Sequence, residues 1–290
     1  MTSRSALTSR GPVLSVAALY FLVPIGAALW YTLDSGGGIS FDAYTRGLTS
    51  EGMAGSLLLS VTIGLATVVL GLLLMVPTSV AVALYFPKLR GVVSVLSMMP
   101  LVVPPIALVA GVSTVLSWQQ DLATTPLYGT FQALLNKDFP LILVLVYTVM
   151  SLPFLHRSLD AGLRSLDLRT LVEASRSLGA SRTQTLLRVV LPNLRSAVVG
   201  GAVLSLAMVL GEYTVASVLG FAPFAVWMVE VGDAEPQLSA AASMLSLLIT
   251  WGLLLLLTTV AGGRARARTR GRARDRSRDR DRESSKKAVV

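Results

Sequence analysis

The sequence predicts an all-α integral membrane protein with six transmembrane helices. It is 53% hydrophobic and only 14% charged, against about 25% charged residues in soluble domains. The charges fall almost entirely between apolar runs of roughly 20 residues, the length that a helix needs to cross a bilayer core of about 30 Å. Each run should be helical, because a single segment in lipid must satisfy its own backbone N–H and C=O groups.

Six apolar runs define the expected spans. The first follows a polar start with Arg4 and Arg10, which formally resembles a signal peptide. This run is too long for a typical signal-peptide core and lacks a clear small-residue cleavage site, so we expect an uncleaved span. The second run is long enough to tilt or to extend into the cytoplasm. The expected spans are 11–33, 55–85, 92–116, 140–159, 197–219 and 239–261.

The basic residues predict the orientation of these spans. Twenty-three of the 25 lie before the first span, in 87–91, in 157–195 or in the tail from 264 onward. The alternate loops hold just Arg46 and Lys137. The positive-inside rule therefore places both termini in the cytoplasm.

The three outward loops, 34–54, 117–139 and 220–238, carry eight acidic residues. An acidic mouth would favour a cationic cargo, but the positive-inside rule by itself also removes basic residues from outer loops. Both explanations stay open. The acids are Asp34, Asp42, Glu51, Asp121, Asp138, Glu230, Asp233 and Glu235.

The residue inventory argues against several classes of site. The chain has no Cys and one His, His156, so we expect no disulfide, no metal site and no cofactor. An intramembrane enzyme needs paired acids, a nucleophile with its base, or metal ligands, and Glu212 has no partner acid within the spans. No Gly-Lys-Ser or Gly-Lys-Thr occurs, so a phosphate-binding P-loop is not expected.

The longest cytoplasmic loop, 160–196, is expected to form two short helices separated by Gly179. Ser181 and Gln184 have the spacing of a capping box at the start of the second helix, and Pro192 should distort its end. A helix-Gly-helix element at a membrane surface has a shape suited to docking. The apolar faces are Leu168, Leu171, Val172, Ser175 and Leu178, then Leu186, Leu187, Val190, Leu191 and Leu194.

This loop contains Glu173-Ala174-Ser175, then three residues, Gly179, nine residues and Val189-Val190-Leu191-Pro192. The pattern resembles the signature of ABC importer permeases, which is Glu-Ala-Ala, three residues, Gly, nine residues, then Ile, any residue, Leu and Pro. The spacing matches throughout, and Ser for the second Ala and Val for Ile are small departures. The resemblance implies a type I importer fold in a bacterial inner membrane. The matching residues are Glu173, Ala174, Ser175, Gly179, Val189, Leu191 and Pro192.

By this resemblance the loop is a coupling helix that inserts into a groove on a cytoplasmic ATPase subunit. Gly179 would let the chain turn sharply and let the partner's backbone approach closely. Glu173 would hold the helix orientation or meet a basic group of the partner. The expected partners are two ATPase subunits, a second permease that is identical or homologous, and an extracytoplasmic solute-binding protein. An ordinary amphipathic surface helix is the alternative.

Two further groups of residues also resemble this family. Pro104 and Pro105 in the third span free backbone carbonyls and bend the helix, as a gate, a cavity lining or a simple packing kink requires. Gly211, Glu212 and Tyr213 form a run in the fifth span. An acid is costly in lipid, so Glu212 should line the translocation path or form a structural hydrogen bond or ion pair.

The sequence indicates the transported substrate less clearly than it indicates the class of transporter. The chain looks most like permeases of the spermidine/putrescine group, whose relatives handle ferric iron, thiamine or aminoethylphosphonate, so a polyamine is favoured. Molybdate and sulfate permeases have a similar Leu-Gly-Glu run, so an oxyanion remains an alternative. A secondary transporter driven by an ion gradient would usually have inverted repeats, and it leaves the loop signature unexplained.

We divide the chain into an N-terminal part with the first span, 1–54, a permease core, 55–262, and a basic tail, 263–290. The tail alternates Arg with small, polar or acidic residues and has no apolar face, so it should be disordered. Because it follows a span directly, we expect it to contact anionic lipid headgroups or to be merely solvated, and we expect no nucleic-acid partner.

Overall fold

The computed structural model describes residues 10–34, 38–256 and 258–259. This part of the chain is helical apart from turns and one isolated bridge between Asp34 and Ile39. It contains five helices that are long and apolar enough to cross a membrane, or six if one sharply bent pair is a single span. The predicted all-α membrane fold is confirmed. The predicted basic tail, 263–290, lies outside the described residues.

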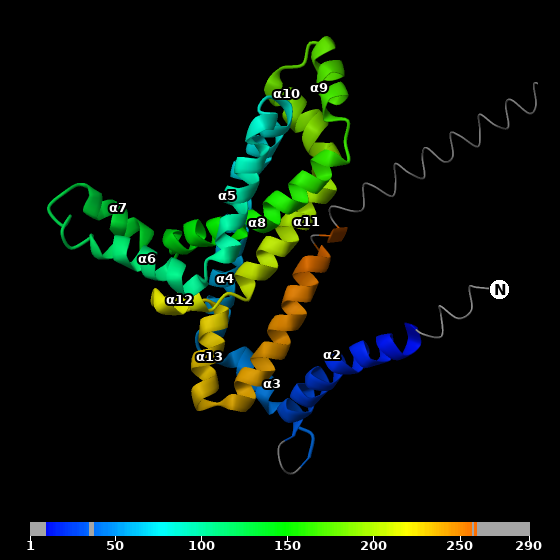
Figure 1. Ribbon diagram of the computed structural model, residues 1–290. Helices are drawn as coiled ribbons and strands as arrows, with labels where there is room; N and C mark the ends of the chain where they lie inside the picture. The colour runs from blue at the N-terminus through cyan, green and yellow to red at the C-terminus, as the bar shows by residue number, and fades with distance from the viewer. Residues whose placement is uncertain (1–9, 35–37, 257, 260–290) are drawn as a thin grey trace, which may run out of the picture.

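Three helices pack against one another at the centre of the bundle (Figure 1). Small residues let them approach closely. A Cβ added to Gly71 would lie 2.5 Å from Leu155 Cδ1, and one added to Gly162 would lie 2.5 Å from Ala197 Cβ. The central helices are α4 (Met53–Leu84), α8 (Leu141–Arg164) and α11 (Leu191–Leu210).

The third expected span, 92–116, is not one helix. It consists of α5 (Arg90–Val102) and α6 (Pro105–Ser117), bent by 96° with respect to each other. Val103 is extended because a residue before proline avoids the helical region, and Pro105 starts α6, where its missing N–H costs nothing. The bend expected at the prolines is confirmed, and α6 projects to the side with α7 (Leu127–Leu134).

The fifth expected span, 197–219, was misplaced. The helix runs over Arg182–Leu210 and so includes the segment expected to be a separate short helix. It comprises α10 (Arg182–Thr185), a π-helical turn η2 (Leu186–Val190) and α11. The Leu191 N–H donates to Leu186 O, five residues back. This wider turn accommodates Pro192, whose ring would clash with a carbonyl four residues earlier in a regular α-helix.

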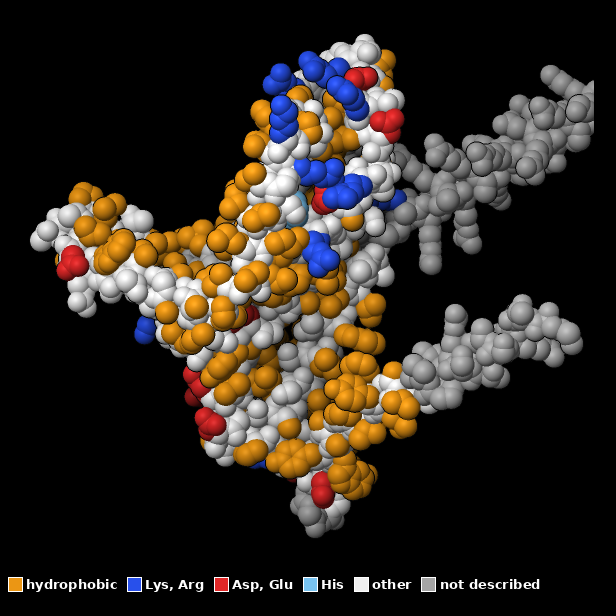
Figure 2. Space-filling view, in the orientation of Figure 1, with side chains coloured by type: hydrophobic (Ala, Val, Ile, Leu, Met, Phe, Trp, Pro, Cys, Tyr) orange, Lys and Arg blue, Asp and Glu red, His pale blue; other side chains and the backbone are white. Residues whose placement is uncertain are grey.

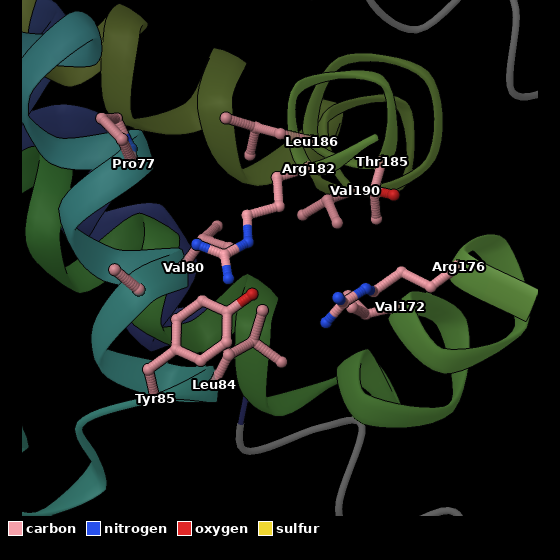
Figure 3. Close-up of a pocket in the computed structure, with 11 residues that line it drawn as sticks. Pro77, Val80, Leu84, Tyr85, Val172, Arg176, Arg182, Thr185, Leu186 and Val190 are labelled. Carbon is pink, nitrogen blue, oxygen red and sulfur yellow. The ribbon is translucent and has the colours of Figure 1, made fainter. Parts of the chain in front are cut away.

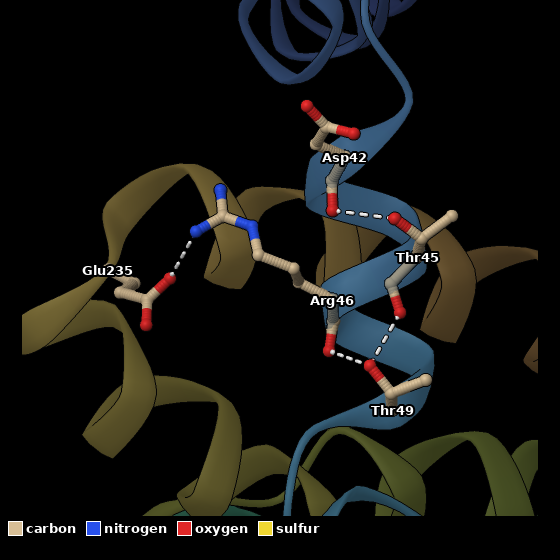
Figure 4. A network of polar contacts seen from close by, with 5 residues as sticks. All are labelled: Asp42, Thr45, Arg46, Thr49 and Glu235. Carbon is tan, nitrogen blue, oxygen red and sulfur yellow. Dashed lines mark hydrogen bonds and ion pairs between the residues drawn. The ribbon is translucent and has the colours of Figure 1, made fainter.

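The end of the molecule opposite α9 and α10 contains helices where the sequence indicated only loops. Ser60 Oγ accepts a hydrogen bond of 2.7 Å from the Phe224 N–H, and Arg46 forms an ion pair with Glu235 (Figure 4). Met53, Phe224, Trp227, Leu238 and Ala242 form a buried apolar cluster there. The helices at this end are α3 (Asp42–Thr49), α13 (Phe224–Ala234) and the start of the last helix (Pro236–Leu256).

The first helix, α2 (Arg10–Leu33), joins the bundle only near its end (Figure 1). There Thr32 Oγ1 lies 2.7 Å from the Tyr44 hydroxyl of α3, and the Gln237 amide donates to Tyr31 O. Few residues of the span Ser15–Leu33 are buried in the chain. Most of its apolar surface is therefore left for lipid or for another subunit.

Candidate functional site

The candidate docking element is α9 (Leu168–Ser177), Gly179 and α10, which form one tip of the molecule (Figure 1). Asp167 caps α9, since its carboxylate accepts bonds from the Thr170 N–H and hydroxyl. Leu168 and Val172 are buried against the end of α4 and the start of the long fifth helix. One face of α9 is thereby fixed to the bundle, and the other is exposed.

The turn between α9 and α10 has the geometry that the sequence indicated. Gly179 has φ of +84°, a left-handed conformation that suits glycine, and a Cβ added there would meet nothing within 4 Å. Ser181 and Gln184 form the predicted capping box, with both bonds present. Leu178 departs from the expected buried face, because it is 89% exposed. The tip thus presents a bare glycine beside a large apolar side chain.

Ser175, which replaces the second Ala of the signature, has a structural reason. Its hydroxyl lies 3.0 Å from the Thr185 hydroxyl, and both side chains are buried. This contact joins α9 to α10 below the turn. The sequence indicated Ser175 as part of an apolar face but gave no sign of its partner.

The other signature residues lie in three environments. Glu173 is exposed, and its carboxylate lies 3.5 Å from Arg169 on the same helix face, a type of surface pair that contributes little to stability. Ala174 is exposed beside it. Leu191 is half-buried and Pro192 is exposed at the junction with α11, away from the tip. The structure therefore places the signature residues from Glu173 to Gly179 in the docking element, whereas Leu191 and Pro192 lie at the junction with α11.

Basic side chains gather at this end of the molecule (Figure 2). Asp160 of α8 forms ion pairs with Arg90 at the start of α5 and with Arg164 one turn further along α8. This pairing fastens α5 to the helix that leads into the docking element. The Arg164 spacing of four residues was visible in the sequence, but the link to Arg90, 70 residues away, was not.

Glu212 lies in the break that ends α11 and precedes the short helix α12 (Thr214–Val218). It is 9% exposed. Its Oε2 accepts a bond of 2.8 Å from the Tyr147 hydroxyl, and its Oε1 accepts one of 2.9 Å from the Val215 N–H. The carboxylate thus holds the first turn of α12 and ties it to α8. Sequence reasoning found Glu212 and missed Tyr147.

The two helix breaks lie in neighbouring parts of the fold. Helix α12 packs against α6, and Val215 shares a buried cluster with Val109, which lies about one turn after Pro105. Tyr213, Pro104 and Pro105 are exposed around these breaks. Irregular backbone at membrane depth is tolerated where it is buried in protein or lines a cavity, so this part of the chain is a candidate wall of a path.

The acidic residues at the end opposite α9 do not form one patch on the face seen in Figure 2, where red side chains occur in separate places. Glu235 is paired with Arg46. The acidic mouth considered for cationic cargo is therefore not a feature of this face of the single chain.

A comparison with known protein families decides the class. A family model described as binding-protein-dependent transport system inner membrane component matches residues 75–270, which include both the docking element and the Glu212 break. The chain belongs to this family. It is accordingly a permease subunit of an ABC importer, a multi-pass inner-membrane transport component rather than an enzyme.

The individual relatives are transport permeases that differ in their named substrates. The chain is 31% identical over 161 residues to a spermidine/putrescine transport system permease protein PotB of Haemophilus influenzae, covering 54% of this chain and 55% of the relative. It is 42% identical over 85 residues to a probable sulfate transport system permease protein cysT of Prototheca wickerhamii, covering 29% and 32%. The chain thus matches less than two thirds of either relative.

The fold is similar to a chain in the crystal structure of a bacterial ABC transporter involved in the import of the acidic polysaccharide alginate. The TM-score is 0.63 at 18% identity, and the match covers 88% of this chain and 98% of that chain. This likeness supports the expected type I importer fold and carries no information on cargo.

Proposed function

We propose that α9, Gly179 and α10 dock into a groove of a cytoplasmic ATPase subunit. When the two ATPase subunits close, this contact would transmit their movement to the transmembrane helices. The observation that carries this proposal is the exposed tip, where Leu178 projects beside a left-handed glycine with open space around it. A leucine that is 89% exposed beside an unobstructed glycine gives a partner an apolar side chain to bury, which stabilises a complex by about 1.5–3 kcal/mol. Both termini then lie in the cytoplasm, on the side of the tip.

The complete transporter would contain two ATPase subunits, a second permease that is identical or homologous, and an extracytoplasmic solute-binding protein. The exposed apolar faces of α5 and α6 are available to lipid or to the second permease. The translocation path would be lined near Pro104, Pro105, Gly211 and Tyr213. Broken helices lining a central site are a recurring device of transporters, and Glu212 would position this wall.

A polyamine such as spermidine or putrescine is the proposed cargo. The PotB relative supports it, because that similarity extends over 54% of this chain, against 29% for the sulfate permease. Uptake of labelled putrescine, spermidine and sulfate by cells that express the complete transporter tests the assignment. Sulfate uptake without polyamine uptake would overturn it.

Docking is tested by co-purification of the chain with its candidate ATPase in detergent. Gly179→Trp fills the open space at the tip and should abolish co-purification. Gly179→Ala introduces only the strain of a left-handed alanine, about 1–2 kcal/mol, and should retain most of it. Gly129→Trp in α7, which also meets open space, is the control for added bulk. Full co-purification of Gly179→Trp would contradict the docking proposal.

A further inference from the structure

A pocket of about 150 Å³ opens at the base of the docking element (Figure 3). Its wall is formed by the end of α4, by α9 and by the α10–η2 segment. Val80, Leu84 and Val172 supply apolar surface, while Arg176 and Arg182 reach toward it from α9 and α10. The pocket therefore combines an apolar wall with two cationic groups that come from different helices.

The two arginines have no acidic partner in the described part of the chain. Arg90, Arg164 and Arg169 all form ion pairs there. None of the described acidic residues pairs with Arg176 or Arg182, a property that they share with Arg157, Arg188 and Arg195, but only Arg176 and Arg182 line this pocket. Arg182 also lies over the Tyr85 ring at 6.0 Å. Two guanidinium groups that line one pocket without a carboxylate favour an anionic ligand, and phosphate is one of the two groups whose geometry the guanidinium matches.

The position and size of the pocket restrict the ligand further. It follows α4 from Pro77 to Tyr85, about 12 Å of helix, at the basic end of a membrane span. Tyr85 is about half exposed there, and tyrosine is enriched at membrane–water interfaces. A cavity of about 150 Å³ holds a molecule the size of benzene, so the apolar part takes a few carbons and not a nucleotide.

We propose that this pocket binds an anionic phospholipid of the cytoplasmic leaflet. The phosphate would lie between Arg176 and Arg182, with the glycerol and the first acyl carbons against Val80, Leu84 and Val172. Because these residues belong to α4, α9 and α10, a bound lipid would link the docking element to the membrane span. The cytoplasmic location rests on the orientation proposed above; the binding itself does not require an ATPase.

The experiment measures lipid retention by the purified chain alone. The chain is exchanged into nanodiscs that contain either phosphatidylglycerol or phosphatidylcholine, extracted gently, and analysed by native mass spectrometry. The variant Arg176→Gln/Arg182→Gln is compared with Arg169→Gln/Arg188→Gln, which removes the same charge from α9 and η2 outside the pocket. Size-exclusion profile and thermal unfolding confirm that each variant is folded.

The wild-type chain and the control variant should retain phosphatidylglycerol in preference to phosphatidylcholine. The pocket variant should retain it about 30-fold less, because two basic contacts are lost. Equal retention by both variants would overturn the proposal. Competition by inorganic phosphate at the same concentration as the lipid would reassign the pocket to a free anion. Unchanged lipid retention with loss of ATPase co-purification would reassign the two arginines to a protein partner.

Discussion

Two places where helices end, the tip around Gly179 and the break around Glu212, contain similar residues in different environments. Each combines a glycine with a nearby acid. At the tip, Glu173 is exposed with only a weak pair to Arg169, and Leu178 is uncovered. At the break, Glu212 is buried and both of its oxygens accept bonds from within the chain. The first arrangement leaves surface for another molecule, whereas the second completes the fold.

The largest effect on stability is expected at the closed break. Glu212→Leu leaves the Tyr147 hydroxyl and the Val215 N–H buried without an acceptor, which should lower the free energy of unfolding by about 2–4 kcal/mol. Glu212→Gln keeps an acceptor and should cost about 1 kcal/mol or less. Denaturant unfolding in detergent, followed by tryptophan fluorescence, measures both changes.

Transport by these variants then separates positioning from contact with cargo. Glu212→Gln at wild-type expression should support uptake if the carboxylate acts by holding α12. Loss of uptake in a normally stable Gln variant would instead place the charge in the path. A Leu variant as stable as the wild type would contradict the contrast between the tip and the break.

At the open tip the expected change is in binding and not in stability. Leu178→Asp should weaken ATPase association by about 10- to 100-fold, because the burial of a leucine on docking contributes about 1.5–3 kcal/mol. Its thermal unfolding should match the wild type. Leu187→Asp, at another exposed leucine of the same loop, is the control. Equal binding by Leu178→Asp would show that the tip does not carry the contact.

The smallest effect is expected for the contact between the Ser175 and Thr185 hydroxyls, which links α9 to α10. Ser175→Ala leaves the buried Thr185 hydroxyl without its partner and should cost about 1 kcal/mol. Thr185→Val should cost a similar amount, and the double variant should cost less than the sum of the two. Denaturant unfolding of the four chains gives the coupling energy. Strict additivity would mean that the two hydroxyls do not stabilise each other.

Local patterns in the sequence predicted local structure well. The capping box at Ser181, the helix stop at Gly179 and the bend at Pro104 all depend on residues within a few positions of each other, and each is present. Hydropathy located most of the expected spans, because burial in lipid needs long apolar runs. It could not place the end of α11 at Leu210, because that end depends on Gly211 and on the carboxylate of Glu212, which starts a new helix.

Contacts between segments that are distant in the chain could not be predicted from the sequence. The Tyr147 partner of Glu212 lies 65 residues away, and nothing in the pattern of either helix marks the pair. The same holds for Arg90 and Asp160. The helices α3, α7 and α13 were missed because they are short and lie in segments that topology alone marks as loops. The role of Glu173 and the translocation path stay predictions.

The joining of α10, η2 and α11 has a mechanical consequence. Arg182–Leu210 is one continuous helix of 29 residues, about 43 Å long. The tip lies at one end of it and the Glu212 break at the other. If a partner moved α10, the displacement would be transmitted along this helix toward Gly211, and the π-helical turn Leu186–Val190 would be its most deformable part. The stiffness of the helix Arg182–Leu210 would then determine how much of a displacement of the tip reaches the Glu212 break.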